Sequence, residues 1–534
     1  MEETPAAQPV RPRVGFVSLG CPKNLVDTEV MMGLLDRAGA ELTPDAETAD
    51  ILVVNTCAFI DKAKQESVDA ILEMAKLKTA GSARRLIVAG CLVERYRDEI
   101  RRNIPEVDAV VGTGELEKIL SAAGLDVPGP APVSASPFNI LSGNGHAEVR
   151  PGRESLAGTH KVSVESQSFR AEGDRREAQG RFSRAAWDGA GAQLPQYLYD
   201  HTTPRLRTTK TASAYIKIAE GCDHPCSFCV IPNLRGKFRS RRFESVVAEA
   251  EALVAEGVRE ITLIGQDTTC YGEDLGLKDG LALLLDRLAQ IEGLTWLRFL
   301  YAYPNRITGQ LLDTMAKHGN ICKYLDVPLQ HSSAPVLKAM KRGGGAEIFL
   351  KMLAKVRDAV PGIALRTSFI VGFPGEADAD FEALCDFVAE ARFDWLGVFA
   401  YSDEDGAKAF DLGDKVPKRV IEQRRRALMK LQKGISRQTI RARIGQTIDV
   451  LVEGESAETP LLWEGRTQHH APEIDGTVYL NDFGSFESLT QGHFYRREIT
   501  EAHDYDLVAR VIEESMWEKD EPKEAALAGA GVEL

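Results

Sequence analysis

Three cysteines lie within eight positions of the chain, at Cys222, Cys226 and Cys229. Thiolates bind iron and zinc, but three ligands cannot complete a four-coordinate site. Bound to a cubic iron-sulfur cluster, three thiolates would hold three irons and leave the fourth iron free for a substrate. The spacing therefore predicts a cluster with one open coordination position.

The alternative is a structural zinc site with His224 as the fourth ligand. However, His224 lies inside the cysteine loop, where a short turn makes simultaneous ligation awkward, and structural zinc ligands usually come as two separated pairs. The spacing of three residues and then two resembles the radical S-adenosylmethionine (SAM) superfamily. In that superfamily the open iron binds SAM, and an electron from the cluster cleaves SAM to a 5'-deoxyadenosyl radical.

Three further cysteines, Cys21, Cys57 and Cys91, each follow a short apolar run and precede a stretch with helical periodicity, such as 28–38 or 62–76. They are 36 and 34 positions apart, close to one βαβ repeat. Because the carboxyl ends of parallel strands meet at one edge, the three thiols could surround one metal centre. A lone cysteine is more often a buried free thiol, but three in register predict a second cluster.

The residues around these cysteines resemble the methylthiotransferase family, in which the three cysteines carry an auxiliary 4Fe-4S cluster that handles the inserted sulfur. The resemblance is carried by Ser18–Glu29, Asn55–Ile60, Gln65–Ser67 and Gly90–Leu92. Cys-Pro-Lys-Asn-Leu-Val-Asp from Cys21 resembles the RimO-type branch, which modifies a ribosomal protein. The tRNA-modifying MiaB-type branch typically has Gln-Met-Asn after the first cysteine. The resemblance implies two 4Fe-4S clusters and SAM as cofactors.

The composition limits which partners the protein can bind and in which cellular compartment it acts. A formal net charge of -14 argues against nucleic acid as the primary target, because phosphate binding normally needs clustered Lys and Arg. No apolar run approaches the roughly 18 residues of a membrane span, and Met1–Val10 has no apolar signal region. Nine cysteines in so long and acidic a chain favour metal ligation over a disulfide framework. We therefore expect a cytoplasmic protein that does not contact a membrane.

Periodicity and composition predict a mixed α/β chain of several domains, divided into 12–125, a disordered insertion or linker at 126–205, 206–437, 438–511 and a tail at 512–534. The family resemblance implies that 12–125 is the methylthiotransferase N-terminal domain, 206–437 the radical SAM domain and 438–511 a TRAM domain. In the central domain, strands and helices alternate, which predicts a parallel sheet with right-handed crossovers. Six such units suit the open partial (β/α)6 barrel of the radical SAM family.

Polar motifs follow several of the predicted central strands, at the end where barrel chemistry occurs. By resemblance to the family, the SAM pocket is lined by Gly265, Gln266, Asp267, Gln330 and Arg366. Each could instead be a turn or structural residue. No catalytic residue is predicted beyond the cluster ligands. The remaining cysteines lack partners at ligand spacing, so we expect ordinary thiols at Cys270, Cys322 and Cys385.

The C-terminal region alternates apolar and polar residues in four segments, which predicts a small antiparallel β-barrel with strands at 447–453, 460–467, 476–480 and 497–507. Ala471–Leu480 resembles the TRAM domain. TRAM barrels commonly bind RNA, but 441–510 holds 13 Asp or Glu against six Arg and no Lys. This charge is unfavourable for phosphate contacts and suits a basic ribosomal protein.

The family resemblance implies that the chain methylthiolates the β-carbon of an aspartate in ribosomal protein number twelve of the small subunit. One SAM would donate the methyl group, a second would supply the radical, and a flavodoxin or ferredoxin would donate electrons. The two cysteine triads would then have to lie close enough to share one substrate side chain. The alternatives are the same chemistry on adenosine in tRNA, or a zinc-stabilised ribosome-binding protein without catalytic activity.

Overall fold

The computed structural model describes residues 11–125, 194–209, 212–456, 459 and 461–519. These residues form two units: the first contains 11–58, 62–125 and 203–208, and the second contains the rest. Most of the predicted insertion (126–193) and the end of the tail (520–534) lie outside the described residues. Within the described residues, no helix is long and apolar enough to cross a membrane.

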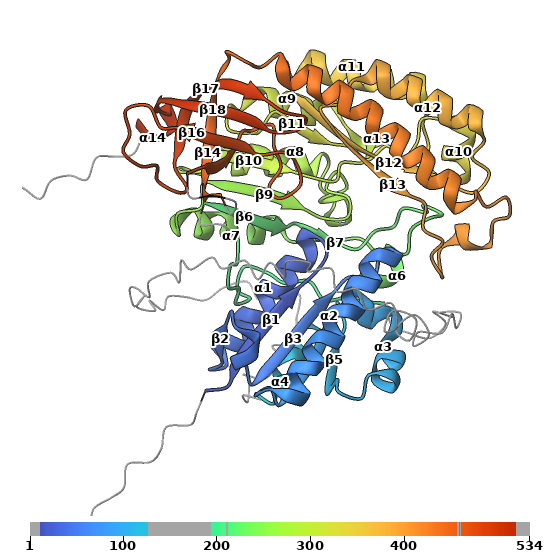
Figure 1. Ribbon diagram of the computed structural model, residues 1–534, viewed down its shortest axis with the longest axis vertical. Helices are drawn as coiled ribbons and strands as arrows, with labels where there is room; N and C mark the ends of the chain where they lie inside the picture. Colours follow the sequence, from blue (N-terminus) through green and yellow to red (C-terminus); the bar gives the residue numbers. More distant parts are fainter. Residues whose placement is uncertain (1–10, 126–193, 210–211, 457–458, 460, 520–534) are drawn as a thin grey trace, which may run out of the picture. The chain divides into compact units, whose positions relative to one another are not determined.

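The first unit contains a five-stranded parallel sheet in the order β2-β1-β3-β4-β5 (Figure 1). Its elements are β1 (Arg13–Ser18), α1 (Pro22–Arg37), β2 (Glu41–Thr43), η1 (Ala46–Thr48), β3 (Ile51–Thr56), α2 (Asp61–Ala80), β4 (Arg85–Gly90), α3 (Cys91–Asn103), β5 (Ala109–Val111), η2 (Leu116–Lys118) and α4 (Ile119–Ala123). The central strand β3 is buried along its whole length, as expected for a parallel strand covered on both faces.

The strand order creates a topological switch point in this sheet. The chain leaves β1 toward β2 on one side and leaves β3 toward β4 on the other. In open α/β sheets, the carboxyl ends of two such strands border the crevice in which ligands bind. Cys21 and Cys57 follow these two strands, and Cys91 follows the next strand along, β4.

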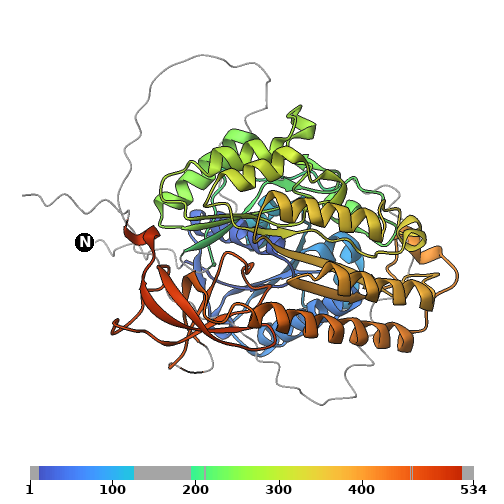
Figure 2. The same cartoon turned by 90° about the horizontal axis from the view of Figure 1, so that it is seen from above.

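The second unit begins with a core of parallel strands whose helices form an arc on their outer side (Figure 2). The strands are β6 (Ser213–Lys217), β9 (Glu260–Ile264), β10 (Trp296–Phe299), β11 (Tyr324–Asp326), β12 (Ala364–Val371) and β13 (Trp395–Ala400). The helices are α6 (Ile231–Arg235), α7 (Phe243–Ala255), α8 (Gly280–Leu288), α9 (Gly309–Lys317), α10 (Ala334–Ala339), α11 (Ala346–Ala359), α12 (Asp378–Ala391) and α13 (Lys418–Arg441). Short 3-10 turns lie between them, at η3 (Glu273–Leu275), η4 (Pro304–Arg306) and η5 (Lys408–Asp411).

These six strands form two three-stranded sheets, β10-β9-β6 and β11-β12-β13. An isolated parallel bridge pairs Leu297 of β10 with Ile321, which lies three residues before β11. Leu, Val, Ile and Phe side chains from strands and helices fill one continuous core. The six-stranded βα architecture predicted from the alternation is therefore confirmed. A short antiparallel ribbon of β7 (Ala219–Glu220) and β8 (Arg239–Ser240) follows β6.

The C-terminal region is a closed five-stranded barrel, which confirms the predicted architecture. Its elements are β14 (Thr447–Glu455), β15 (Trp463–Arg466), β16 (Val478–Asp482), β17 (Phe494–Ala502) and β18 (Leu507–Glu514), followed by α14 (Met516–Lys519). Two details differ from prediction. The expected single strand 497–507 is a hairpin of β17 and β18, turning where His503 N donates to Asp506 O at 2.8 Å, and β16 pairs with β18 in parallel.

A buried ion-pair network holds this barrel against the amino ends of the core strands. Arg466 of β15 bonds Glu260, the first residue of β9, with 2.5 Å between Nη2 and Oε2, and Arg298 lies on the same carboxylate. Burial raises the pKa of Glu260, but the two arginines outweigh it and the net shift is downward. The carboxyl ends of the core strands, where the cysteine loop begins, are not covered by these contacts.

Candidate metal centres

The first cysteine triad follows the carboxyl ends of three neighbouring strands. The last paired residues of β3 and β4 directly precede Cys57 and Cys91, and Cys21 lies three residues beyond the end of β1. Cys21 is the N-cap of α1, and Cys91 begins α3. None of the three forms a disulfide; Cys91 is buried and the other two are half-buried. Their role as cluster ligands stays a prediction.

Two glycines allow the turns that carry these cysteines to approach one another. Gly20 and Gly90 have φ values of 95° and 94°, in the region that favours glycine. A Cβ on Gly20 would lie 2.9 Å from Cys57 Cβ, and one on Gly90 would lie 2.6 Å from Thr56 O. Any side chain at either position would therefore force the strand ends apart.

Side-chain hydrogen bonds fix the same turns. Asn24, three residues after Cys21, donates to Thr56 O at 3.3 Å, and Asn55 donates to Asn24 O at 2.8 Å. Ser67 Oγ accepts from Cys57 N at 2.9 Å and donates to Cys57 O at 2.8 Å. These bonds give a structural reason for the presence of Asn24 and Ser67 in the motifs that resemble the methylthiotransferase family.

The second triad lies in the loop between β7 and α6, beyond the carboxyl end of β6. Gly221 has a φ of 81°, and a Cβ there would lie 2.1 Å from Lys237 O. Cys222 N donates to Gly236 O at 3.2 Å, and Cys229 N donates to Cys226 O at 3.3 Å. The backbone itself thus holds the loop in a defined turn.

The second triad provides a set of sulfur donors suited to a cluster. Burial raises the pKa of Cys222 to about 11 and that of Cys229 to about 12, and repulsion from the neighbouring triad sulfurs adds to both shifts. Sulfurs close enough to repel one another as thiolates need a cation between them, and metal binding deprotonates such thiols. The three residues therefore fit a metal cluster.

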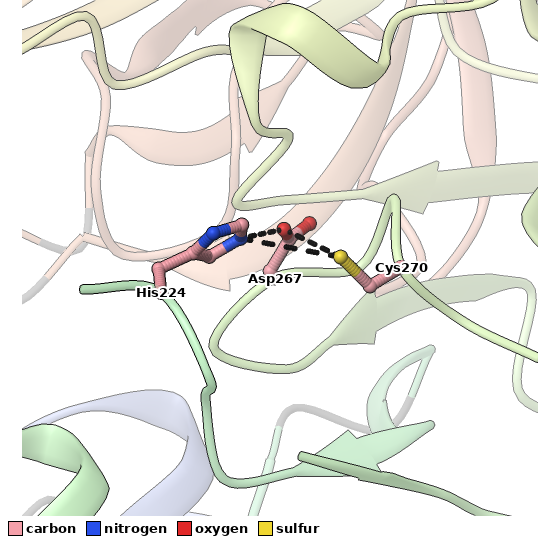
Figure 3. A group of neighbouring side chains, drawn as sticks. All are labelled: His224, Asp267 and Cys270. Atoms are coloured by element: carbon pink, nitrogen blue, oxygen red, sulfur yellow. Dashed lines mark hydrogen bonds and ion pairs between the residues drawn. The ribbon is translucent and has the colours of Figure 1, made fainter. Parts of the chain in front are cut away.

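His224 is engaged by an acidic partner outside the loop. Its Nε2 lies 2.6 Å from Asp267 Oδ2 (Figure 3), and its ring stacks on Tyr303 with 4.0 Å between centroids. Cys270 Sγ donates to the same carboxylate oxygen at 2.9 Å. The ligand atoms of His224, Asp267 and Cys270 lie within 4.8 Å of one another, but burial and Asp267 raise the pKa of Cys270. We interpret the group as a hydrogen-bonded network around one carboxylate.

Three predicted pocket residues, Gly265, Gln266 and Asp267, directly follow β9 and lie beside the cysteine loop. Gln266 Nε2 donates to Glu220 Oε1 at 2.6 Å, two residues before Cys222. The other amide atom, Gln266 Oε1, is buried and has no hydrogen-bond partner within the described part of the chain. This oxygen can accept a hydrogen bond from a ligand, so the residue fits its predicted role in binding SAM, which stays a prediction.

The other two predicted pocket residues belong to the strands β11 and β12 or to the segments that follow them. Gln330 follows β11 with a φ of 72°, and its backbone N donates to Ser368 O at 2.9 Å. Arg366 lies in the amino-terminal half of β12, where Nη1 is 2.8 Å from Asp326 Oδ1 and Nε is 3.5 Å from Asp475 Oδ1. These contacts of Arg366 are with the strand β11 and the C-terminal barrel, so its predicted role toward SAM gains no support from them.

Two residues near the cysteine loop were missed by the sequence reasoning. Tyr303 stacks on His224, and Arg342 donates to Cys226 Sγ at 3.6 Å. The position of Tyr303 in the sequence could have indicated its role, because it follows the third core strand at the carboxyl end, where site residues gather. Arg342 had none, since it lies more than a hundred positions from the triad and outside any ligand spacing.

Comparisons with known families agree with this architecture. A model described as uncharacterized protein family UPF0004 matches residues 13–112, the radical SAM superfamily matches 216–388, and the TRAM domain matches 444–512. Together with the cysteine loop at the carboxyl ends of a six-stranded core, these matches define a radical SAM enzyme.

Curated relatives show which family of radical SAM enzymes the chain resembles. A protein named ribosomal protein uS12 methylthiotransferase RimO from Koribacter versatilis is 64% identical, over 96% of this chain and 98% of its own length. Proteins of that name from Solibacter usitatus and Geobacter sulfurreducens are 52% and 44% identical, over 97% and 94% of this chain and 98% of each relative. The chain belongs to this RimO family of radical SAM methylthiotransferases, which bind 4Fe-4S clusters and SAM.

Similarity to solved structures is weaker. The radical SAM methyltransferase TsrM from Kitasatospora setae aligns with a TM-score of 0.46 and 16% identity, over 73% of this chain and 72% of that chain. A likeness at this level supports no inference about activity.

Proposed function

We propose that this chain methylthiolates the β-carbon of an aspartate in ribosomal protein uS12, in the bacterial cytoplasm. The observation that carries the proposal is the arrangement of two complete cysteine triads, each at the carboxyl ends of parallel strands, in a chain 64% identical to a protein named for this reaction.

Each triad would hold one 4Fe-4S cluster. Cys222, Cys226 and Cys229 would bind the cluster that faces SAM, and Cys21, Cys57 and Cys91 would bind the auxiliary cluster. When bound, the clusters and two molecules of SAM supply the radical, the sulfur and the methyl group. A radical is required because no acid or base side chain near neutral pH can remove hydrogen from an unactivated carbon at a useful rate.

The chain's own residues prepare the site. Gln266 Oε1, buried and without a partner in the described residues, would accept a hydrogen bond from SAM. The backbone around Gly221 holds the three thiols of the loop in position, and Gly20 and Gly90 allow the other triad to converge. Preorganisation of this kind reduces the entropy lost when cofactor and substrate bind.

The acidic C-terminal barrel favours a basic protein substrate. Residues 441–510 hold 13 acidic residues and six arginines, and two of those arginines, Arg466 and Arg497, are buried. The surface of the barrel is therefore more acidic than the totals indicate. Such a surface attracts a basic protein and repels a phosphate backbone. A small redox protein such as a flavodoxin or ferredoxin would donate the electrons.

The substrate is tested by incubating the anaerobically reconstituted protein with SAM, sulfide and dithionite, together with either uS12 or unmodified tRNA. We expect mass spectrometry to find a methylthio group on one aspartate of uS12 and none on tRNA. A uS12 variant with alanine in place of that aspartate is the matched control and should stay unmodified. Methylthiolation of tRNA without modification of uS12 would contradict the proposed substrate.

A further inference from the structure

A chain of contacts leads from the Asp267 network to a proposed iron ligand. The His224 ring stacks on Tyr303 with 10° between the ring planes. The guanidinium of Arg342 also lies over the Tyr303 ring, with Cζ 4.4 Å from its centroid. From there Arg342 Nη1 donates to Cys226 Sγ at 3.6 Å, which is within hydrogen-bond range for a sulfur acceptor.

The position of Arg342 is fixed by further contacts. Its Nη2 donates to Pro328 O at 2.9 Å, and its backbone N donates to Leu337 O at 2.8 Å. The segment just before it is bound to the cysteine loop, because Ser227 N donates to Met340 O at 3.0 Å and Ser227 Oγ donates to Ala339 O at 2.8 Å. The guanidinium is therefore held beside the sulfur by both its side chain and its backbone.

The positive charge of Arg342 lies beside the sulfur of Cys226. A guanidinium keeps its charge at every pH at which a protein is folded. A cluster bound by three thiolates becomes more negative on reduction, so a fixed cation within a few ångströms stabilises the reduced form more than the oxidised form.

We propose that Arg342 is a positioning residue that raises the reduction potential of the radical SAM cluster, through its hydrogen bond to Cys226 and its fixed positive charge. The inference rests on the proposed function only in taking Cys222, Cys226 and Cys229 as the cluster ligands. Tyr303 keeps the guanidinium in place, and His224 and Asp267 keep Tyr303 in place.

The test is an anaerobic redox titration followed by electron paramagnetic resonance. The full chain carries Cys21→Ala, Cys57→Ala and Cys91→Ala, so that only one cluster contributes to the signal. We expect Arg342→Gln to make reduction about tenfold less favourable, a shift of about 59 mV to more negative potential for one electron. Arg342→Lys, which keeps the charge but loses the planar donor pair, should shift the potential less.

Lys341→Gln is the matched control. It removes one positive charge from the neighbouring position, but Lys341 is exposed and its charge is screened by solvent, so the potential should stay at the parent value. An unchanged potential in Arg342→Gln, with about four irons per chain retained, overturns the inference and leaves the proposed function standing. A parent protein that binds no iron contradicts the proposed function instead.

If Arg342→Gln loses its cluster, a second variant tests the effect of Arg342 on the reduction potential. Tyr303→Leu removes the aromatic ring under the guanidinium but leaves Arg342 and all three thiols in the chain. The freed guanidinium should spend less time beside Cys226, so the potential should move in the same direction by a smaller amount. In that case, a Tyr303→Leu protein with an intact cluster and the parent potential overturns the inference.

Discussion

Replacing Cys222 by alanine is expected to reduce SAM cleavage to the level of a protein-free control. Two remaining thiolates cannot hold a cubic cluster with one open iron, and the chain offers no substitute sulfur in the loop. The change should leave the fold intact, because Cys222 is half-buried and its backbone N–H keeps its bond to Gly236 O. The measurement is 5'-deoxyadenosine released from SAM under dithionite.

Cys270→Ala is the matched control for this experiment. Cys270 is also a free thiol, and its sulfur lies 4.0 Å from His224 Nε2, but we assign it to the hydrogen bonds of Asp267. Asp267 would keep its bonds from His224 and Thr269, so SAM cleavage should continue. Loss of cleavage in Cys270→Ala together with normal cleavage in Cys222→Ala would contradict the assignment of ligands.

The second large effect concerns the auxiliary triad. Cys21→Ala is expected to leave the release of 5'-deoxyadenosine near the wild-type level, while transfer of the methylthio group to uS12 falls to background. The variant should lose only the second reaction, because formation of the radical depends on the triad in the cysteine loop and supply of the sulfur depends on the triad that contains Cys21. The Cys21 side chain makes no capping hydrogen bond to α1, so its loss should cost the helix little stability. Both products can be measured in one reaction by mass spectrometry.

Cys385→Ala is the matched control, because it removes a thiol that belongs to neither triad. Cys385 is a half-buried free thiol on α12, without a partner at ligand spacing. This variant should carry out both reactions. If Cys21→Ala transfers the methylthio group as well as Cys385→Ala does, the auxiliary triad does not carry the sulfur chemistry.

Most of the fold could be predicted from local patterns, and the failures have physical causes. The apolar run that precedes Cys57 located β3, because a strand buried on both faces carries a strong signal. The edge strands β2 and β5 were missed because three residues are too short to show periodicity. The turn between β17 and β18 was missed because 503–506 contains no glycine or proline.

In the candidate site, too, the local features could be predicted from the sequence and the contacts between distant segments could not. The two triads could be predicted because ligand spacing and strand ends are local features of the sequence. The contact of Arg342 with Cys226 joins residues 116 positions apart, and the ion pair of Arg366 with Asp475 joins the core to the C-terminal barrel. Such contacts depend on how distant segments pack, which neither periodicity nor spacing encodes.

The central claim is that the chain holds two separate three-cysteine clusters, and an iron count tests it most directly. The wild-type chain, reconstituted without oxygen and freed of unbound metal, should contain about eight irons, and Cys222→Ala and Cys21→Ala should each retain about four. Stoichiometric zinc without iron in the wild-type chain, or loss of all iron from either variant, would contradict the account.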